Sequence, residues 1–182
     1  MNHEDNNNKK KNPIKIDLGC RIEKPEGYIG LDSEPWPGVD IIHDLTKIPW
    51  PFPDNYADVI RASHVVEHLP SLSQFLGEVA RVGKNGSELI LIFPHYSRSM
   101  FSSQHLGHYG IGILRGFKQF KVESIKLKYT WWGWKHWYKF PAYLFLAVIE
   151  LLANLSPKFW ERVWCYWFGG FDNIIIKARI KK

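Results

Sequence analysis

Short apolar runs alternate along this chain with glycine turns and polar stretches. The run at 14–20 ends in a glycine turn, and the run at 28–32 ends in a carboxylate. Apolar runs of this length, bounded by turn residues, are typical of buried strands. Five later runs share these features and predict further strands: 39–45, 56–62, 87–94, 120–127 and 173–180. Apolar residues at helical spacing predict a helix over 72–82, so the chain has the alternating pattern of an α/β domain.

The first two runs carry residues that suit a nucleoside. Gly19 would let the backbone approach a ligand without a Cβ in the way. Asp32, at the carboxyl end of its strand, can accept two hydrogen bonds from a ribose diol. No Gly-Lys-Ser/Thr phosphate cradle and no G-x-G-x-x-G fingerprint follows these runs. The pattern therefore favours a ligand that contains ribose and no pyrophosphate.

Four segments, taken in order, resemble the small class I S-adenosylmethionine-dependent methyltransferases of the methyltransferase type 11 group: IDLGC, GYIGLDS, DIIHDL and PWPFPDNYADVIRASHVVEHL. The resemblance covers about residues 14–110, with a weaker match at the last strand. It implies a Rossmann-like methyltransferase fold, with a mostly parallel seven-stranded sheet and an antiparallel last strand. It also implies S-adenosyl-L-methionine as the cofactor. The residues themselves predict a reduced first helix and a helical insertion before the last strand.

The resemblance implies a set of cofactor contacts along the carboxyl ends of the first four strands. Gly19 would lie beside the methionine part and Asp32 on the ribose hydroxyls. Asp44 would hold the adenine amino group, and the next backbone N–H would bind a ring nitrogen. The positions that carry these contacts are Asp17, Gly19, Cys20, Asp32, Asp44, Leu45, Ser63 and His64.

Two features depart from the usual pattern of that family. Arg21 stands where the family has the last glycine of Gly-Cys-Gly, so its side chain must turn out of the pocket or crowd the cofactor. Only residues 21–27 separate the first two strands, whereas a parallel crossover normally takes about a dozen residues or more. The first helix must therefore be reduced to about one turn.

Histidines after the fourth and fifth strands are candidates for chemistry on a methyl acceptor. A general base is needed only where the acceptor must lose a proton. We predict His105 as that base or as a substrate contact, with His68 and His108 as further candidates. The alternative is that Glu67 and His68 cap or anchor the helix they begin. Gly107 disfavours a helix that would align His105 with His108, and no third ligand is near, so we predict no metal site.

The 182 residues suit one domain. Residues 1–12 are polar and rich in Asn and Lys, which predicts a disordered tail without a signal peptide, before a methyltransferase domain at 13–182. The chain's cysteines, Cys20 and Cys165, do not make a disulfide framework. This usage fits a reducing compartment, so we expect a cytoplasmic protein.

An aromatic-rich insertion spans about 129–171, before the last strand. Its apolar run, 141–155, is shorter than the about 20 residues that cross a bilayer, and Glu150 interrupts it. From Arg115 to Lys139 the excess of basic residues alone matches the net charge of +6. Tryptophans and lysines beside an apolar helix suit the inner face of an anionic membrane. The alternative is a helix pair that packs on the domain or forms a homodimer.

Three classes of function remain open. The first is an S-adenosylmethionine-dependent methyltransferase that acts on a small-molecule, glycan or lipid-linked acceptor. The second is a nucleic-acid methyltransferase, because basic and aromatic residues together can hold phosphates and stack bases. No Asp/Asn-Pro-Pro-Tyr-like motif follows the fourth strand, which makes nucleic acid the less favoured acceptor. The third is a relative that binds the cofactor without catalysis, which Arg21 motivates.

Overall fold

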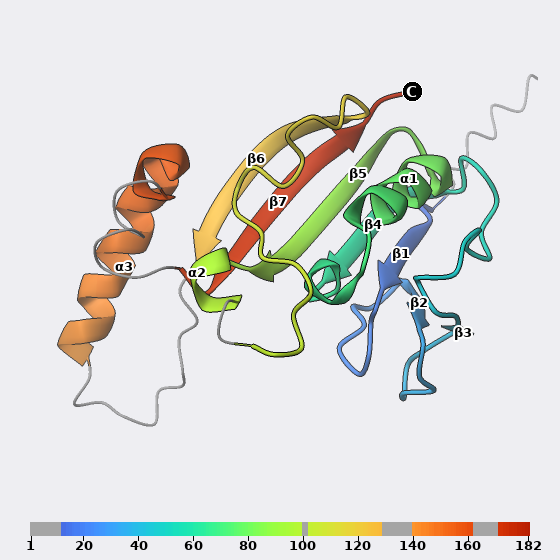
Figure 1. The fold of residues 1–182 in the computed structure, drawn as a ribbon, viewed down its shortest axis with the longest axis horizontal. Helices are drawn as coiled ribbons and strands as arrows, with labels where there is room; N and C mark the ends of the chain where they lie inside the picture. The colour runs from blue at the N-terminus through green and yellow to red at the C-terminus, as the bar shows by residue number, and fades with distance from the viewer. Residues whose placement is uncertain (1–11, 100–101, 129–139, 162–170) are drawn as a thin grey trace, which may run out of the picture.

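Seven strands form one sheet in the order β3-β2-β1-β4-β5-β7-β6 (Figure 1). The computed structural model describes residues 12–99, 102–128, 140–161 and 171–182. In chain order the strands are β1 (Lys15–Leu18), β2 (Ile29–Asp32), β3 (Ile41–Ile42), β4 (Ala57–Ser63), β5 (Gly83–Pro94), β6 (Phe120–Lys128) and β7 (Asn173–Ile180). Strands β1 to β5 pair in parallel, and β7 is antiparallel to both β5 and β6. The predicted sheet is confirmed.

The core follows the two-residue period of the central strands. Along β5, Leu89, Leu91 and Phe93 are fully buried, and the residues between them are half-buried. Neighbouring β7 repeats the pattern with Ile174 and Ile176. Side chains of a strand alternate between the two faces, so one face of this sheet lies against the main core and the other is less well covered.

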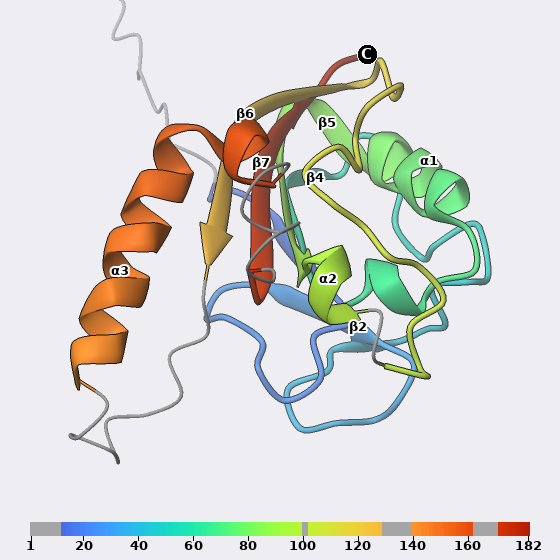
Figure 2. The same cartoon turned by 60° about the vertical axis from the view of Figure 1, so that its left-hand side comes forward.

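Helices lie on both sides of the sheet. They are the 3-10 helix η1 (Val66–His68), α1 (Leu72–Val82), α2 (Tyr96–Ser99) and α3 (Phe140–Leu155). Figure 2 shows α1 and α2 on one side of the sheet and α3 on the other, beside β6. Helix α1 matches the predicted range, and its first turn is capped by Ser71, whose hydroxyl accepts the N–H of Gln74 at 3.2 Å.

Local departures from the sequence prediction have identifiable causes. Residues 19–28 form turns, so the connection between β1 and β2 is reduced even further than one helical turn. Strand β5 begins directly after α1, before the predicted start at residue 87, and contains an irregularity where Gly86 has a φ of 80°. Strand β3 keeps two residues of the predicted 39–45, because only two pairs join it to β2.

A pair of charges on α1 holds the loop before β4. Glu78 accepts the backbone N–H of Trp50 at 2.7 Å and binds Arg81 at 2.7 Å. Arg81 in turn donates to the carbonyls of Phe52 and Trp50. Trp50 and Phe52 are buried, and the ring of Trp50 packs against Phe75 of α1. The Arg81 guanidinium holds the pKa of the Glu78 carboxyl below its usual value.

The edge of the sheet at β6 is covered by α3. The side-chain amide of Asn154 accepts the N–H of Leu127 at 2.9 Å and donates to its carbonyl at 3.0 Å. One amide thus satisfies both backbone groups of an edge residue, as a neighbouring strand would. Ile149 and Ala153 of the same helix are buried. The helix therefore has an inward side, which contacts the sheet edge.

We predict that Arg81→Met lowers the free energy of unfolding by about 2–4 kcal/mol, because Glu78 would keep a poorly hydrated charge without its partner. Lys84→Met is the control, since its ion pair with Asp58 is more exposed than that of Arg81 with Glu78 and contributes about 1 kcal/mol or less. Urea denaturation at pH 7 measures both changes. Equal losses in the two variants would contradict the assignment.

The same pair gives the stability a defined pH dependence. Because the folded-state pKa of Glu78 is lowered, its contribution is fully present above the unfolded-state value of about 4.3. The contribution is lost as the pH falls through the lower, folded-state pKa. The difference in unfolding free energy between wild type and Arg81→Met should therefore narrow at about pH 3. A difference that does not change between pH 7 and pH 3 would contradict this linkage.

Candidate active site

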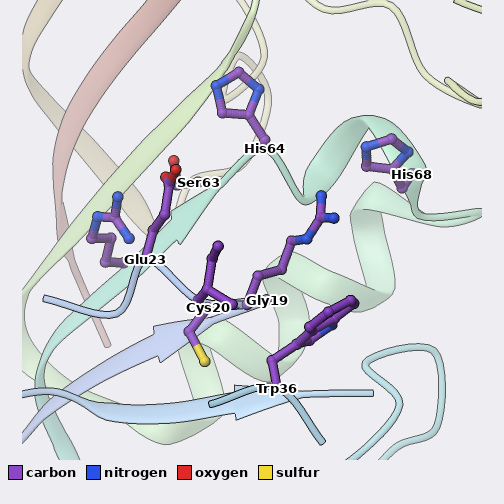
Figure 3. Close-up of a pocket in the computed structure, with 10 residues that line it drawn as sticks. Gly19, Cys20, Glu23, Trp36, Ser63, His64 and His68 are labelled. Carbon is purple, nitrogen blue, oxygen red and sulfur yellow. The ribbon is translucent and has the colours of Figure 1, made fainter. Parts of the chain in front are cut away.

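A cavity of about 390 Å³ opens at the carboxyl ends of β1 and β4. From β1 the chain continues to β2 and β3 on one side, and β4 and β5 lie on the other, so the strand order reverses here. Open parallel sheets bind ligands in the crevice at such a reversal. The sequence-predicted residues that line the cavity are Gly19, Cys20, Ser63, His64 and His68 (Figure 3).

Gly19 begins the turn after β1 in a conformation that favours glycine. Its φ is 64°, and its N–H donates to the carbonyl of Leu31 at 2.7 Å, which ties the turn to β2. A Cβ on Gly19 would collide with the side chain of Val65, in the segment after β4. Only glycine therefore allows the two strand ends to approach this closely.

Cys20 serves this turn as a small packing residue. The side chain is buried, and a Cβ added to Gly30 would collide with its sulfur. Burial, together with the nearby carboxylates of Asp17 and Asp32, raises the pKa of the thiol to about 11. The thiolate is the nucleophilic form of cysteine, so Cys20 is unsuited to nucleophilic catalysis at neutral pH.

A buried ion pair joins β1 to β4 below the cavity. Asp17 is fully buried, and its Oδ1 accepts a hydrogen bond from Nη1 of Arg61 at 2.7 Å. Its Oδ2 has no hydrogen-bond partner among the described residues. Burial raises the pKa of Asp17, and Arg61 opposes that shift. Arg61 also lines the cavity, so the pair presents a buried acceptor and a guanidinium at one place.

Two acids are predicted to bind ribose and adenine: Asp32, which ends β2, and Asp44, which follows β3. Neither is among the residues that line the cavity. Asp32 is buried and accepts the backbone N–H groups of Arg21 at 3.0 Å and Glu34 at 3.2 Å. Asp44 accepts the N–H and the hydroxyl of Thr46, and the N–H holds its carboxyl pKa below the usual value. The carbonyl of Leu45 accepts Nε1–H of Trp50. A carboxylate has about four acceptor positions, so both acids keep capacity for a ligand.

Arg21, which replaces the family's glycine, is turned toward the rim of the cavity. Its φ of 45° lies in the region that favours glycine. The guanidinium carbon lies 5.8 Å from the ring centroid of Trp36, within the range of a cation–π contact. Both side chains are exposed and line the cavity. Sequence reasoning missed Trp36 and Arg61, because neither belongs to a motif that names it.

Two histidines meet beside the cavity, and His68 lines it. The rings of His68 and His105 lie 5.0 Å apart between centroids, in an edge-on arrangement. His108 is exposed, further along the same loop. The capping role considered for Glu67 and His68 is wrong: they form the separate helix η1, and Ser71 caps α1. Glu67 is buried although its neighbour His68 is exposed, and no pattern in the sequence indicated this burial.

Residues 32–91 match the family model described as a methyltransferase domain. The comparison with curated proteins yields no match. A putative methyltransferase from Bacillus halodurans is 14% identical, with 94% of each chain covered and a TM-score of 0.58. An S-adenosylmethionine-dependent methyltransferase from Archaeoglobus fulgidus is 20% identical, with 93% of this chain and 87% of that chain covered and a TM-score of 0.57.

A third similar structure comes from the complex between the Haloferax volcanii Trm112 methyltransferase activator and a putative methyltransferase. It is 13% identical, with 93% of this chain and 83% of that chain covered and a TM-score of 0.60. At these identities the structures show a shared fold. The family match covers residues 32–91, about a third of the chain, and the shared fold is that of methyltransferases, among them one that depends on S-adenosylmethionine. Both findings support S-adenosylmethionine as the cofactor.

The cavity fits the amino-acid part of that cofactor. The buried Oδ2 of Asp17, next to the cavity-lining Arg61, has no donor in the described part of the chain, which suits an ammonium group. Arg61 has further N–H donors besides the one bonded to Asp17, and a guanidinium suits a carboxylate. The glycine turn lies at the carboxyl end of the strand that carries Asp17. This chain's residues would therefore hold the methionine end through paired opposite charges.

We predict that Asp32→Asn weakens binding of S-adenosylhomocysteine at least about tenfold, because the ribose hydroxyls lose a charged acceptor that contributes about 1.5–3 kcal/mol. Calorimetric titration measures the change. Asp40→Asn is the control, since Asp40 also accepts a backbone N–H, from Gly30, but is exposed. Unchanged affinity in a folded Asp32→Asn protein, or equal losses in the two variants, would contradict the role of Asp32.

Proposed function

We propose that this protein transfers a methyl group from S-adenosylmethionine to a small-molecule, glycan or lipid-linked acceptor. The observation that carries the proposal is the cavity lined by Arg61 and His68, with the buried Asp17 paired to Arg61 and its Oδ2 unsatisfied among the described residues. When bound, the cofactor supplies an electrophilic methyl group on its sulfonium. The rest of the task is to position the acceptor and to remove its proton.

Positioning falls to the residues at the ends of β1 and β4. Asp17 and Arg61 would fix the two charged groups of the methionine part, and the turn at Gly19 fixes the distance between the strand ends. Holding two reactants at near-attack geometry supplies several kcal/mol of the barrier without any covalent role for the protein. Ser63 and His64, which follow along the cavity wall, would form the floor under the reacting atoms.

Proton removal falls to the histidines. His68 lines the cavity, and the ring of His105 meets it edge-on. An acceptor hydroxyl or amine beside them would lose its proton as the new bond forms, which is the step that a general base assists. We propose His105 as the principal contact, with His68 and the more exposed His108 as supporting groups.

A nucleic-acid acceptor is the alternative, and the topology disfavours it. The exposed lysines that motivate this alternative, Lys121, Lys126 and Lys128, lie on β6. Strands β5 and β7 separate β6 from β4, so this basic strip is at one edge of the sheet, whereas the cavity is at its middle. A nucleic acid bound along β6 would not bring its bases to the methyl donor.

We also propose that α3 holds the domain against the cytoplasmic face of an anionic membrane. Five exposed apolar side chains follow a helical period on the outward side of this helix: Leu144, Val148, Leu151, Leu152 and Leu155. Phe145, one turn before the buried Ile149, is exposed as well. Three exposed lysines lie close by, Lys126 and Lys128 on either side of the Leu127 that Asn154 binds, and Lys158 just beyond the helix. In the described part of the chain no helix is long and apolar enough to span a bilayer.

Such a surface would bring a lipid-linked acceptor within reach. Apolar side chains of a surface helix enter the headgroup boundary, and each nearby Lys or Arg adds about 1 kcal/mol against anionic lipid. The tryptophans at 131, 132, 134 and 137, which motivated the prediction from sequence, lie outside the described residues. The proposal therefore rests on α3 and on the lysines around it.

The first test is transfer of labelled methyl groups from S-adenosylmethionine into separate acceptor pools: lipid and lipid-linked extracts, free glycans, small molecules, and nucleic acid. We expect label in one of the first three pools and none in nucleic acid, and Asp32→Asn should lower the incorporation. His105→Ala should reduce turnover by about a hundredfold while leaving the affinity for S-adenosylhomocysteine unchanged.

Three results would overturn this assignment. Label in nucleic acid alone would favour the alternative acceptor. Binding of S-adenosylhomocysteine without incorporation into any pool would indicate a relative that does not catalyse transfer. Loss of cofactor affinity in His105→Ala, equal to its loss of turnover, would make this histidine structural.

The second test is flotation with vesicles that contain anionic phospholipid. Wild-type protein should float with the vesicles at low salt and dissociate at high salt. Leu151→Ser with Leu155→Ser should abolish flotation. The control pair, Ile42→Ser with Ile48→Ser, removes equally exposed apolar groups on the far side of the sheet and should float as wild type does. The outward side of α3 would be a subunit interface instead if the wild-type protein does not bind vesicles and is a dimer. In that case Leu151→Ser with Leu155→Ser should make the protein monomeric.

A further inference from the structure

Three potential metal ligands converge beside the cavity. Glu67, His68 and His105 each offer one ligand atom, and these atoms all lie within 4.8 Å of one another. The backbone brings them together, because the carbonyl of Glu67 accepts the N–H groups of Leu106 at 2.7 Å and Gly107 at 3.1 Å. The loop that carries His105 is thereby fixed onto η1. Ligands of a tetrahedral zinc lie about 3.4 Å apart, so small side-chain rotations would close the set.

Glu67 supplies a buried negative charge without adequate compensation. Its side chain is 2% exposed, and neither carboxylate oxygen has a hydrogen-bond partner in the described part of the chain. Nδ1 of His64 lies 3.2 Å from Oε1 of Glu67, and this contact is an ion pair only if the imidazole is protonated. Buried carboxylates in proteins are normally hydrogen-bonded, paired or bound to a metal. The second oxygen of Glu67 therefore indicates a missing cation.

His68 is held in the form that a metal requires. Its Nδ1 lies 3.1 Å from the carbonyl oxygen of Gln104. A carbonyl only accepts, so Nδ1 must carry the proton, and Nε2 has a free lone pair in the neutral ring. Histidines that bind metals usually donate their other ring N–H to a carbonyl or carboxylate in this way. The loop that contains Gln104 and His105 thus orients His68 and also supplies His105 as a second imidazole ligand.

We propose that Glu67, His68 and His105 form a binding site for one divalent transition-metal ion, such as Zn²⁺. Two imidazoles and one carboxylate suit zinc or iron better than calcium or magnesium, which prefer oxygen ligands. Three protein ligands leave a coordination position open, and His68 lines the cavity, so that position is on the acceptor side. Sequence spacing missed the site because its other two ligands lie on η1, far from His105 in the chain.

The role of this metal ion in the reaction rests on the proposed function. An acceptor oxygen bound to the ion would have a lowered pKa, so that its O–H bond breaks and the proton passes to water. The oxygen would then attack the methyl carbon: the O–CH3 bond forms as the S–CH3 bond breaks, and S-adenosylhomocysteine is the leaving group. The ion would then carry the proton-removing role, with His68 and His105 as its ligands. Each of these residues would still be required for turnover.

The test is titration of the full chain, prepared without a histidine tag and stripped with chelator, with Co²⁺ and then Zn²⁺. We expect one equivalent of Co²⁺ to produce visible d–d absorption, and one equivalent of Zn²⁺ to displace it. Glu67→Gln and His105→Ala should each weaken binding at least about a hundredfold, since each removes one of three ligands. His43→Ala is the control. His43 lies after β3, where its Nε2 is 2.8 Å from the backbone carbonyl oxygen of Lys47, and this substitution should leave metal affinity unchanged.

The outcomes separate this inference from the proposed function. No binding by wild type, or binding that both ligand variants leave intact, overturns the metal site. His105→Ala alone decides the case if Glu67→Gln does not fold, because His105 is on a surface loop and is half-buried. Metal binding without binding of S-adenosylhomocysteine would support the site and overturn the proposed function. Methyl transfer by a chain that binds no metal would support the proposed function and overturn the metal site.

Discussion

The ion pair between Asp17 and Arg61 is the interaction on which the rest of the site depends. The two residues face each other across the parallel pairing of β1 and β4, at the point where the strand order reverses. A carboxylate with no exposure is tolerated there only because a guanidinium lies beside it. The second oxygen stays unsatisfied, so the pair stabilises the sheet incompletely and leaves a place for a positive group.

The missing first helix changes how the turn after β1 is held. In a typical doubly wound sheet a helix begins at this turn and its free N–H groups face the ligand. Here the carboxylate of Asp32 accepts the N–H of Arg21, and the carbonyl of Leu31 accepts that of Gly19. Both acceptors belong to β2. The geometry of the cavity therefore depends on the end of one strand, and Asp32 has a structural role together with its expected contact to ribose.

Much of the fold could be predicted from the sequence, because strand and helix periods are local. The ranges 72–82 and 173–180 match α1 and β7 fully, whereas β3 is shorter than its apolar run because pairing with an edge decides its length. The site was less accessible. Gly19 has a local signal, but Arg61 takes its meaning from the register that sets it opposite Asp17. The nearness of Glu67 to His105 depends on backbone hydrogen bonds between a 3-10 helix and a loop, which no spacing reveals.

The sheet separates two tasks. Strands β1 and β4 carry the cavity, while β6 and α3 form the opposite edge. The edge is closed by Asn154, a polar side chain that replaces a strand partner, so the outward side of α3 can be apolar without exposing β6 to aggregation. Because none of the described side chains of α3 lines the cavity, a partner bound on this helix would not block the cofactor. A surface of this kind can determine where the domain binds without altering how its site works.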